Sequence, residues 1–501
     1  MIPLTLAEVA EVAAGTLVAA DPRAQATGVA VDSRAVRPGD LFFGLAGERA
    51  DGAAFAADAA AAGAVAAVVP AGRVAGGHDR DAGRLPRVEV GDPLAALAAV
   101  AGAVRARARA RVVGVTGSSG KTITKDLLAA VLATRLRTLA SERSFNNELG
   151  LPLTLARLEP ETEALVVELG ARGVGHVAEL CRLARPDAGV VTNVGVAHIG
   201  VFGSRDAIAR AKAELPRALP PGGVVVLNAD DPRVAAMASL TAARVVTYGV
   251  RSPADVRAER VALDADGRAG FLLVTPDGTA EAALPVPGEH LVPDALAAAA
   301  AGWALGVPVD RAARALAGAA LSPMRMQVRR RGDGATVIDD AYNANPDSTA
   351  AGLKALAAAR RPGGRTIAVL GEMAELGPFA DAEHDRVGRL LVRLGVDRLV
   401  AVGEPGRVIV RAARQEGIWE PGDAVAVDAV DEVAAAVGPL EPTDVVLVKA
   451  SRVVGLDRVV ERLLEAPDPV TTAPRTAGED RGGPGGRSAA PRGVGDPWGG
   501  P

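Results

Sequence analysis

The stretch that most constrains the fold is RVVGVTGSSGKTITKDLLAAVLA, residues 111–133. It begins with a run of β-branched residues, continues through a turn of glycine and serine, and ends in an amphipathic stretch with apolar residues at helical spacing. This pattern predicts a strand, a tight turn and a helix in direct succession. Such a succession is typical of a parallel sheet with helices packed on both faces. We therefore predict an α/β fold.

The alternation of strands and helices predicts several domains in this chain of 501 residues. Residues 1–110 predict a small N-terminal α/β domain that ends in a linker helix. Residues 111–320 predict a central doubly wound parallel sheet, although shorter strand-like pieces between about 255 and 287 interrupt its alternation. Residues 321–466 predict a Rossmann-like C-terminal domain that opens with a hairpin. Residues 467–501 are rich in glycine and proline, which predicts a disordered tail.

Composition and charge exclude several classes of protein. The formal net charge of −4 gives no reason to expect a nucleic-acid partner. The N-terminal segment lacks the basic region of a signal peptide, and no stretch of about 18 residues is both strongly apolar and free of charges or breaks. The one cysteine, Cys181, excludes an internal disulfide and a zinc site of several cysteines. We expect a cytoplasmic protein without a membrane span, and we expect a monomer.

Lysine and asparagine are scarce, and their positions are therefore informative. Only five of the 56 basic residues are lysine, and asparagine occurs six times. Arginine serves on a surface as well as lysine does, but arginine cannot lose its proton in a protein. Asparagine both donates and accepts hydrogen bonds, which ionised aspartate cannot do. We expect the remaining lysines and asparagines to mark positions where this chemistry is needed.

The turn TGSSGKT, residues 116–122, has the composition of a phosphate-binding loop. Its glycines let backbone N–H groups face phosphate oxygens, and the following helix adds the positive end of its dipole. Lys121 would span the outer phosphates of ATP, and the Thr122 hydroxyl would ligate Mg²⁺. Val115 stands where the general pattern has its first glycine, so the alternative is an ordinary strand-to-helix turn. The predicted phosphate contacts are Gly117, Ser118, Ser119, Gly120, Lys121, Thr122 and Ile123.

Further polar residues lie where open parallel sheets place their ligands, past the ends of predicted strands. Glu168 ends one strand, and His198 follows the next. With Thr122 and the ATP phosphates they would hold one or two Mg²⁺ ions. Lys212 lies on a predicted helix whose other basic residues are arginine. The alternatives are satisfied polar side chains for Glu168 and His198 and a solvated helix face for Lys212.

Segments distributed along the chain resemble the Mur ligase family. They occur in the family's order and cover about residues 25–465. The segments are TGSSGKT (116–122), SFNNELGLPLTL (144–155), VVELGARGVGH (166–176), TNVGVAHIGVFGS (192–204), AKAEL (211–215), DDAYNANPDS (339–348), VLGEMAELG (369–377) and VLVKASR (446–452). The combination of YNANP with NNELGLPLTL is typical of the family member that adds a dipeptide.

The resemblance implies both an architecture and an activity. The implied domains are an N-terminal UDP-sugar-binding domain, a central ATPase domain and a C-terminal domain that binds the acceptor. The implied enzyme joins D-alanyl-D-alanine to UDP-N-acetylmuramoyl-tripeptide through an acyl phosphate. This is the last cytoplasmic step of UDP-muramoyl-pentapeptide synthesis, which supplies cell-wall peptidoglycan. ATP and Mg²⁺ are the implied cofactors.

The resemblance also implies roles for individual residues. Glu168 and His198 are implied metal ligands, and Lys212 is implied to be carbamylated by CO₂, so that its carboxylate completes a second Mg²⁺ site. Only a neutral amine attacks CO₂, which explains a lysine where arginine is the rule. Arg325 is implied to reach the γ-phosphate. The implied nucleotide contacts are His290, Asp294, Asp340 and Asn343, and the implied substrate contacts are Ser33, Arg34, Asn146, Asn147, Tyr342 and Asn345.

Two positions depart from the family pattern. The family carries His-Asn-x-x-Asn before an alanine-rich helix, where the asparagines recognise adenine, whereas this chain has HLVPD at residues 290–294. Because an ionised Asp294 accepts but cannot donate a hydrogen bond, we expect ATP binding to be weaker by about 1–3 kcal/mol. The second departure is Ala450, where glycine is common.

Other interpretations stay open at this point. A family member that adds diaminopimelate or lysine is disfavoured because its Asp-Asn-Pro-Arg signature is absent. A non-catalytic nucleotide-binding derivative is disfavoured because the loop lysine and the candidate metal ligands are all retained. A strand-end cap with a surface arginine is the alternative for Ser33 and Arg34. An asparagine-rich turn is the alternative for Asn146 and Asn147.

Overall fold

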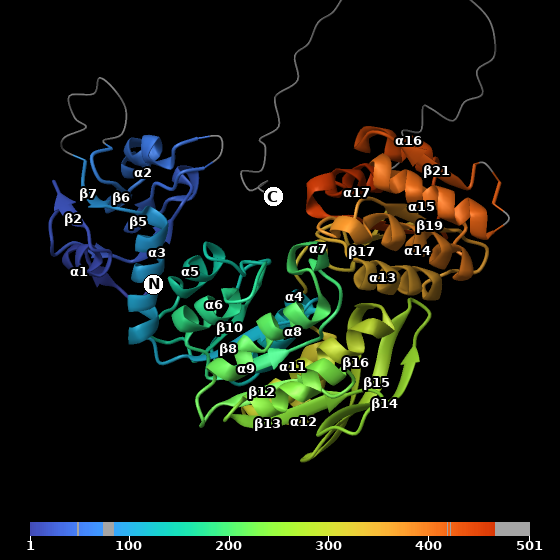
Figure 1. Ribbon diagram of the computed structural model, residues 1–501, viewed down its shortest axis with the longest axis horizontal. Helices are drawn as coiled ribbons and strands as arrows, with labels where there is room; N and C mark the ends of the chain where they lie inside the picture. The colour runs from blue at the N-terminus through green and yellow to red at the C-terminus, as the bar shows by residue number, and fades with distance from the viewer. Residues whose placement is uncertain (48–49, 74–84, 418, 421, 466–501) are drawn as a thin grey trace, which may run out of the picture. The chain divides into compact units, whose positions relative to one another are not determined.

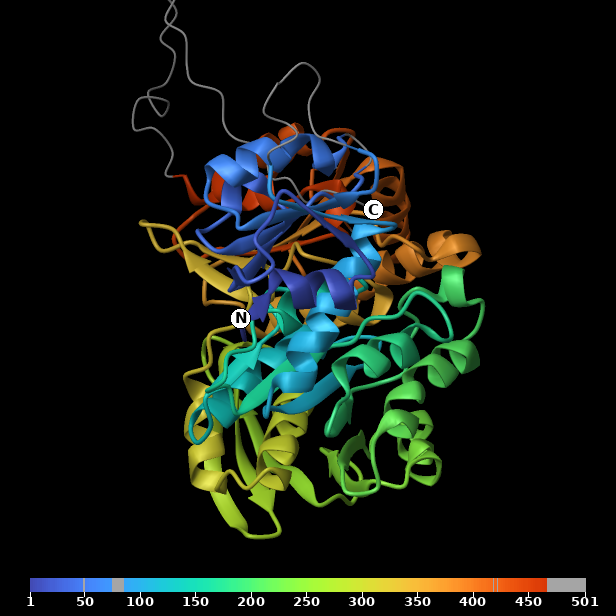
Figure 2. The same cartoon turned by 90° about the vertical axis from the view of Figure 1, so that its left-hand side faces the viewer.

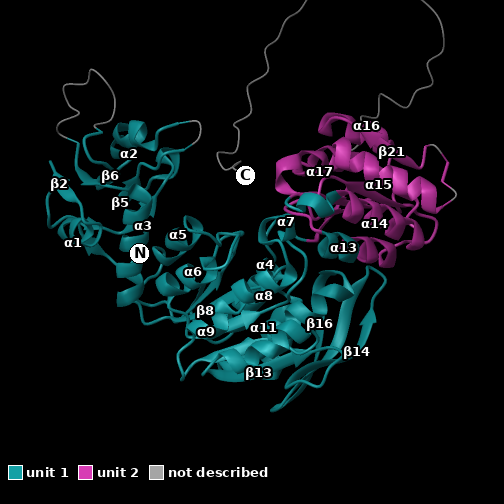
Figure 3. Cartoon of the chain, in the orientation of Figure 1, with its two compact units in different colours: residues 1–325, 346–351, 375–380 teal, residues 326–345, 352–374, 381–501 magenta. Residues whose placement is uncertain are grey.

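The computed structural model describes residues 1–47, 50–73, 85–417, 419–420 and 422–465. The predicted disordered tail, residues 467–501, lies outside the described residues. The chain forms two compact units, which Figure 3 distinguishes by colour. Unit 1 comprises residues 1–325, 346–351 and 375–380, and unit 2 comprises residues 326–345, 352–374 and 381 onward.

The N-terminal part of unit 1 is built on a five-stranded sheet in the order β2-β7-β6-β5-β4 (Figure 1). Its strands are parallel except β2, which runs antiparallel to β7. Phe43 of β5, Val68 of β6 and Val9 of α1 are buried in one hydrophobic core. The elements are β1 (Leu4–Thr5), α1 (Leu6–Val12), β2 (Thr16–Val18), β3 (Gln25–Ala26), β4 (Gly28–Ala30), β5 (Asp40–Phe43), α2 (Ala56–Ala61), β6 (Ala66–Pro70) and β7 (Arg87–Val90).

Helix α3 (Pro93–Arg107) connects this sheet to the rest of unit 1, as Figure 2 shows. The Asp92 side chain caps the helix by accepting a hydrogen bond from the Leu94 N–H, and Pro93 occupies the first turn. Its buried residues, among them Leu97 and Val104, belong to the same core as β5 and β6. The helix also packs on α5 (Gly150–Leu155) and α6 (His176–Ala184). The N-terminal and central parts of unit 1 therefore share one hydrophobic core.

A nine-stranded sheet forms the centre of unit 1, in the order β16-β15-β14-β13-β12-β11-β8-β10-β9. The strands from β9 to β14 pair in parallel, with β8 between β10 and β11. The central strands β8, β10, β11 and β12 are almost wholly apolar, as expected when both faces are covered. Their bounds are β8 (Arg111–Thr116), β9 (Thr138–Ala140), β10 (Ala164–Glu168), β11 (Ala188–Val191), β12 (Val224–Asn228), β13 (Arg244–Gly249), β14 (Val256–Leu263), β15 (Arg268–Thr275) and β16 (Gly278–Pro287).

Two groups of helices cover this sheet, which confirms the predicted doubly wound α/β class. One group comprises α4 (Lys121–Ala133), α11 (Val292–Ala304) and α12 (Val309–Ala317), which pack on one another. The other group is centred on α6, which packs on α8 (Arg205–Lys212) and α9 (Glu214–Ala218). The short helices α7 (Ile199–Phe202) and α10 (Pro232–Ala235) follow β11 and β12 along the chain.

The strand-like pieces between residues 255 and 287 interrupt the alternation of strands and helices, as predicted, but they belong to the same sheet. Strands β14, β15 and β16 have 8, 8 and 10 residues and form an antiparallel meander that extends the sheet beyond β13. Their alternating buried and partly exposed residues explain why the sequence looked different here. One face of an antiparallel sheet can be solvated, whereas the parallel strands are buried on both faces.

Unit 2 is built on a six-stranded sheet in the order β17-β18-β22-β19-β20-β21. The predicted hairpin is confirmed, because β17 pairs antiparallel with β18, and all other pairs are parallel. The strands are β17 (Gln327–Arg330), β18 (Thr336–Asp339), β19 (Thr366–Leu370), β20 (Arg398–Val402), β21 (Ala424–Val427) and β22 (Val445–Lys449). The helices that alternate with them are α13 (Pro346–Ala358), α14 (Ala380–Arg393), α15 (Gly403–Glu416), α16 (Val433–Val437) and α17 (Asp457–Leu464).

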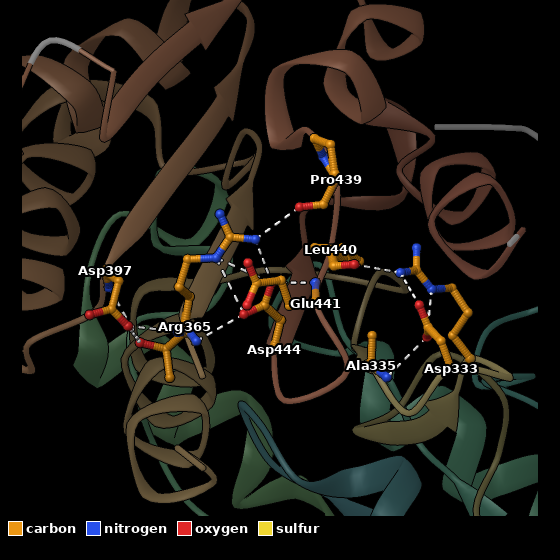
Figure 4. A network of polar contacts seen from close by, with 10 residues as sticks. Asp333, Ala335, Arg365, Asp397, Pro439, Leu440, Glu441 and Asp444 are labelled. Carbon is orange, nitrogen blue, oxygen red and sulfur yellow. Dashed lines mark hydrogen bonds and ion pairs between the residues drawn. The ribbon is translucent and has the colours of Figure 1, made fainter. Parts of the chain in front are cut away.

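The amino ends of these parallel strands are tied together by a polar network that Figure 4 shows. Asp444 is completely buried, and its carboxylate accepts hydrogen bonds from the Arg365 guanidinium, at 2.5 Å for Nη2, and from the backbone N–H of Arg365 at 2.9 Å. The guanidinium also donates to the Pro439 carbonyl. The network joins the residues that precede β19 and β22.

Among the described residues, no helix is long and apolar enough to cross a membrane.

Candidate active site

The carboxyl ends of β8, β10 and β11 meet at the centre of the nine-stranded sheet, and the predicted phosphate loop follows β8. The loop needs glycine at two positions. A Cβ on Gly117, whose φ is +153°, would lie 1.8 Å from the Thr192 Oγ1 atom. A Cβ on Gly120, whose φ is +78°, would lie 2.2 Å from an oxygen of Asp294. The loop is therefore closely packed, and a larger residue at either position would displace it.

Two residues after β11 hold the loop in shape. The Asn193 carbonyl accepts a hydrogen bond from the Ser118 N–H at 3.0 Å, and the Asn193 side-chain oxygen accepts one from the Ser119 N–H at 3.0 Å. The Thr192 hydroxyl donates to the Ser119 carbonyl at 2.7 Å. The sequence placed Thr192 and Asn193 in a family segment but assigned them no role, because their contact with the loop depends on the order of the strands. They fix the loop from the neighbouring strand.

Lys121 is the first residue of α4 and lies across the loop. Its Nζ donates to the Gly117 carbonyl at 3.0 Å and lies 3.4 Å from the Ser118 carbonyl. Burial is the main cause that lowers the pKa of Lys121, and the nearby Arg325 adds to the effect, whereas Glu168 opposes it. The amine is therefore held by the backbone of the loop.

Thr122, Glu168 and Arg325 lie together at the start of α4. The Thr122 hydroxyl donates to one oxygen of Glu168 at 2.8 Å, and the Asn146 amide donates to the other at 2.8 Å. Arg325 Nη2 donates to the Thr122 hydroxyl at 3.2 Å and to the Ser144 hydroxyl at 3.0 Å. Glu168 is almost completely buried. The structure thus brings four predicted residues together, and Ser144 joins them without having been predicted.

Lys212 ends α8 and is buried, with 3% of its surface exposed. Among the described residues, none forms a hydrogen bond or an ion pair with its amine. Burial lowers the pKa of Lys212 to about 7, and Lys121 contributes to this shift, while Glu168 and Glu214 oppose it. The structure therefore excludes the alternative of a solvated helix face. A large fraction of this amine is neutral near pH 7.

The hydrogen bond of His198 is to a different residue, Glu375. His198 precedes α7 in a left-handed conformation with φ of +60°, and its Nδ1 atom is bonded to the Glu375 carboxylate. The imidazole holds the pKa of Glu375 below its usual value. Within the described ranges, no cluster of three or more His, Cys, Asp or Glu side chains is arranged to hold a metal ion. That His198 shares a metal site with Glu168 stays a prediction.

Asp294 packs against the phosphate loop in a different state from the one the sequence suggested. It is buried on α11, and its carboxyl group lies 3.3 Å from the Thr124 hydroxyl. Burial raises the pKa of Asp294 to about 8, and the hydrogen bond from Thr124 opposes the shift. This raised pKa favours the protonated carboxyl group near pH 7, which both donates and accepts hydrogen bonds, whereas the sequence argument assumed an ionised group. His290 lies in the short 3-10 turn Glu289–Leu291 before α11.

Two pairs of predicted substrate residues make local contacts. Asp32 precedes the 3-10 turn Ser33–Ala35, and its carboxylate forms an ion pair with the exposed Arg34 side chain at 2.7 Å. The Asn147 side-chain oxygen accepts hydrogen bonds from the N–H groups of Leu149 and Gly150 at the start of α5. These contacts agree with the cap and turn alternatives. A role in binding substrate stays a prediction for Ser33, Arg34 and Asn147.

In unit 2, the loop after β18 is fixed by Lys449. The Lys449 amine donates to Asp340 at 2.5 Å and to the Asn343 carbonyl at 2.9 Å. The second oxygen of Asp340 accepts from the Met326 N–H at 3.2 Å. Tyr342 and Asn345 lie on the same loop. Both oxygens of Asp340 thus have partners within unit 2, so that its direct contact with ATP remains only a prediction.

Family models match most of the chain. A model described as Mur ligase middle domain matches residues 115–302, which include the phosphate loop. A model described as Mur ligase, glutamate ligase domain, matches residues 324–452. A model described as Mur ligase family, catalytic domain, matches residues 25–105.

Individual proteins match over nearly the whole chain. The UDP-N-acetylmuramoyl-tripeptide–D-alanyl-D-alanine ligase of Mycobacterium tuberculosis (strain ATCC 25618 / H37Rv) is 49% identical, with 93% of this chain and 98% of the relative covered. A crystal structure of MurF from Acinetobacter baumannii has a TM-score of 0.79 at 30% identity and covers 93% of this chain and 99% of that one. MurF from Thermotoga maritima in complex with ADP has a TM-score of 0.73 at 28% identity, covering 87% and 97%.

Proposed function

The chain belongs to the Mur ligase family, and we propose that it joins D-alanyl-D-alanine to UDP-N-acetylmuramoyl-tripeptide in peptidoglycan synthesis. It is an ATP-dependent ligase. The observation that carries this proposal is the group formed by Thr122, Glu168 and Arg325 beside the phosphate loop. This group supports the proposal because it brings a carboxylate, a hydroxyl and a guanidinium together beside the phosphate loop.

The chemistry explains why these residues suffice. A carboxylate is a poor electrophile, because its charge repels the attacking amine and oxide is a poor leaving group. Transfer of the γ-phosphoryl group from ATP to the carboxylate releases ADP and gives an acyl phosphate. The neutral amine of D-alanyl-D-alanine attacks the acyl carbon, phosphate leaves, and the nitrogen loses a proton to water to give the amide. Lys121 and Arg325 stabilise the charge that develops on the phosphoryl oxygens. Positioning and charge neutralisation therefore replace a nucleophilic side chain.

The same site fits Mg²⁺. Glu168 supplies a buried carboxylate and Thr122 a hydroxyl 2.8 Å from it, and oxygen ligands of this kind suit a hard cation. Mg²⁺ held there would neutralise phosphate charge. We include His198 in this proposal as a further metal ligand.

We propose that Lys212 is carbamylated and that its carboxylate is a further metal ligand. The reaction needs a neutral amine, which forms an N–C bond to CO₂ and releases a proton to water. The burial of Lys212 and its lack of a bonded partner in the described chain support this assignment. Labelling with ¹³C-bicarbonate tests it, because a carbamate carbon signal is expected in the native protein and is absent from Lys212→Arg.

The remaining assignments are part of the same proposal. Residues 1–110 bind the UDP end of the substrate, residues 111–320 bind ATP, and residues 321–466 bind the dipeptide. The enzyme acts as a monomer in the cytoplasm, where ATP is supplied. Ser33 and Arg34 line the pocket for the UDP-sugar. Asn146, Asn147, Tyr342 and Asn345 are the other substrate contacts, and His290, Asp294, Asp340 and Asn343 contact the nucleotide.

One assay tests the function. Purified protein is given ATP, Mg²⁺ and UDP-N-acetylmuramoyl-tripeptide, and phosphate release is compared with D-alanyl-D-alanine, with diaminopimelate or lysine, and with no acceptor. We expect release that depends on D-alanyl-D-alanine and is lost in Lys121→Met. Release with a single amino acid would favour a sibling ligase. Absence of release with every acceptor would favour a non-catalytic protein.

A further inference from the structure

Lys125 is a buried lysine that the proposed chemistry does not use. It lies one turn after Lys121 on α4, and 2% of its surface is exposed. Its amine donates to the Asp126 carboxylate at 2.5 Å and to the Ser141 carbonyl at 2.7 Å. A planar guanidinium on a longer side chain does not match a compact site with these two acceptors. This explains a lysine in a chain where arginine predominates.

Asp126, which is bonded to Lys125, also binds a second segment of the chain. One of its oxygens bonds to Lys125, and the other accepts a hydrogen bond from the Ser322 N–H at 2.7 Å. The Asp126 side chain is 9% exposed, so water competes little for these contacts. Ser322 lies three residues before Arg325, whose guanidinium bonds to Thr122. The carboxylate thus anchors the backbone that leads to Arg325.

Ser141, the partner of Lys125, begins the loop that carries Ser144 and Asn146. Its N–H donates to the Val166 carbonyl at 2.9 Å, and its hydroxyl accepts from the Glu168 N–H at 3.4 Å. The loop is therefore attached to β10 on one side and to Lys125 on the other. Beyond this anchor, Ser144 bonds to Arg325 and Asn146 bonds to Glu168.

We propose that Lys125 and Asp126 are positioning residues that attach two separate segments to the helix of the phosphate loop. Lys125 sets the loop of Ser144 and Asn146, and Asp126 sets the segment of Arg325. The two anchored segments then converge on Thr122 and Glu168. The inference rests on the proposed function for its kinetic test, since Arg325 is assigned there to the transferred phosphoryl group.

The central test couples Asp126 to Arg325. We expect Asp126→Ala to lower kcat by about 10- to 100-fold and to change the KM for ATP by less than about threefold, because Arg325 acts in the transition state. In an Arg325→Met background the same substitution should lower kcat by less than about threefold, because the positioned group is gone. Asp126→Asn should recover part of kcat, since its amide oxygen still accepts from Ser322. Equal losses in both backgrounds would overturn the proposal.

Asp444→Ala is the matched control. Asp444 is also a buried carboxylate with a cationic partner and a bonded backbone N–H, but it lies at the amino edge of the other sheet. We expect its loss to lower activity only in proportion to the folded fraction, with the same factor in the Arg325→Met background. If Asp126→Ala behaves like Asp444→Ala, the Lys125 pair is only structural.

Hydrogen exchange gives a readout that is independent of activity. Amides of residues 322–325 should exchange about tenfold faster in Asp126→Ala than in wild type, and those of residues 142–146 should do so in Lys125→Met. Unchanged exchange in both would overturn the proposal. If Asp126→Ala does not fold, Asp126→Asn is compared with Asp444→Asn. The same measurements are made, and the same outcomes decide. Failure of the proposed function is recognised separately, because wild type would then release no phosphate on addition of D-alanyl-D-alanine.

Discussion

The carboxyl edges of the two large sheets each hold a buried lysine, and the two lysines differ in their partners. Lys212, at the nine-stranded sheet of unit 1, is 3% exposed, and Lys449, at the six-stranded sheet of unit 2, is 2% exposed. Lys449 bonds to the Asp340 carboxylate and to the Asn343 carbonyl. Lys212 has no bonded partner among the described residues. The two lysines are thus buried to a similar extent. They differ in whether the amine has a hydrogen-bonded partner.

Pairing decides what a buried lysine does. A charge removed from water must gain a partner or lose its proton. Lys449 has the partner and holds the loop that carries Tyr342 and Asn345. Lys212 lacks such a partner among the described residues. Burial lowers its pKa to about 7, so that the neutral form of the amine is populated near pH 7. We infer that the paired lysine serves structure and the unpaired one serves chemistry.

Removal of the paired lysine has the largest expected effect on stability. Lys449→Met leaves Asp340 buried without its cation, and loss of one partner of a buried pair typically costs about 3–5 kcal/mol. Urea unfolding measures the change. Replacing Asp340 by leucine in the same variant should recover most of it, because neither charge then remains. Lys354, an exposed lysine of the same unit, is the control, and Lys354→Met should change stability by less than about 0.5 kcal/mol. Similar losses for Lys449→Met and Lys354→Met would contradict the comparison.

Substitution of the unpaired lysine should affect catalysis instead. Lys212→Arg keeps a cation but cannot be carbamylated, and loss of one preorganised electrostatic group costs about 10²- to 10³-fold in rate. Steady-state kinetics measure the loss, and circular dichroism checks that the fold is kept. A smaller variant, Lys212→Ala, should be partly rescued by added short carboxylates. Full activity in Lys212→Arg would show that this lysine is not a chemical group.

The sequence predicted those parts of the site that depend on residues close together along the chain. The phosphate loop follows from seven consecutive residues, and Glu168 follows from its place at the end of a strand. The contacts of Asn193 and Ser144 did not follow, because Asn193 comes after β11, the neighbour of β8, and Ser144 comes after β9, two strands from β8 on the other side. The Glu375 partner of His198 is 177 residues away and had no local signal. Sequence patterns identified the elements, and the contacts between distant segments had to come from the structure.

The fold shows the same limit. Alternation predicted the parallel strands and the hairpin of β17 and β18, because both have local signatures. It did not predict that β14 to β16 continue the nine-stranded sheet, since register between distant strands is not encoded in a local pattern. The protonation state of Asp294 also could not be predicted from a sequence pattern. The raised pKa of Asp294 results from burial, which depends on how α11 packs.

Asp294 extends the comparison to a buried acid without a cationic partner, and its substitution should change catalysis less than substitution of Lys212. Its pKa is about 8 in the folded protein, against an ordinary value of 3.8. Between these values the folded state keeps a proton that the unfolded state has released. The stability of wild type therefore falls as pH rises through this window, by at most about 1.4 kcal/mol per pH unit.

Asp294→Asn removes this titration but retains a group that donates and accepts hydrogen bonds. We therefore expect the variant to gain stability over wild type as pH rises from 5 to 8, and its KM for ATP to change by less than about threefold. Urea midpoints measured at intervals across this range test the first expectation. Parallel stability curves for the two proteins would mean that Asp294 is ionised after all. Its carboxylate would then need a cationic partner, and the contrast between paired and unpaired buried charges would no longer hold at the phosphate loop.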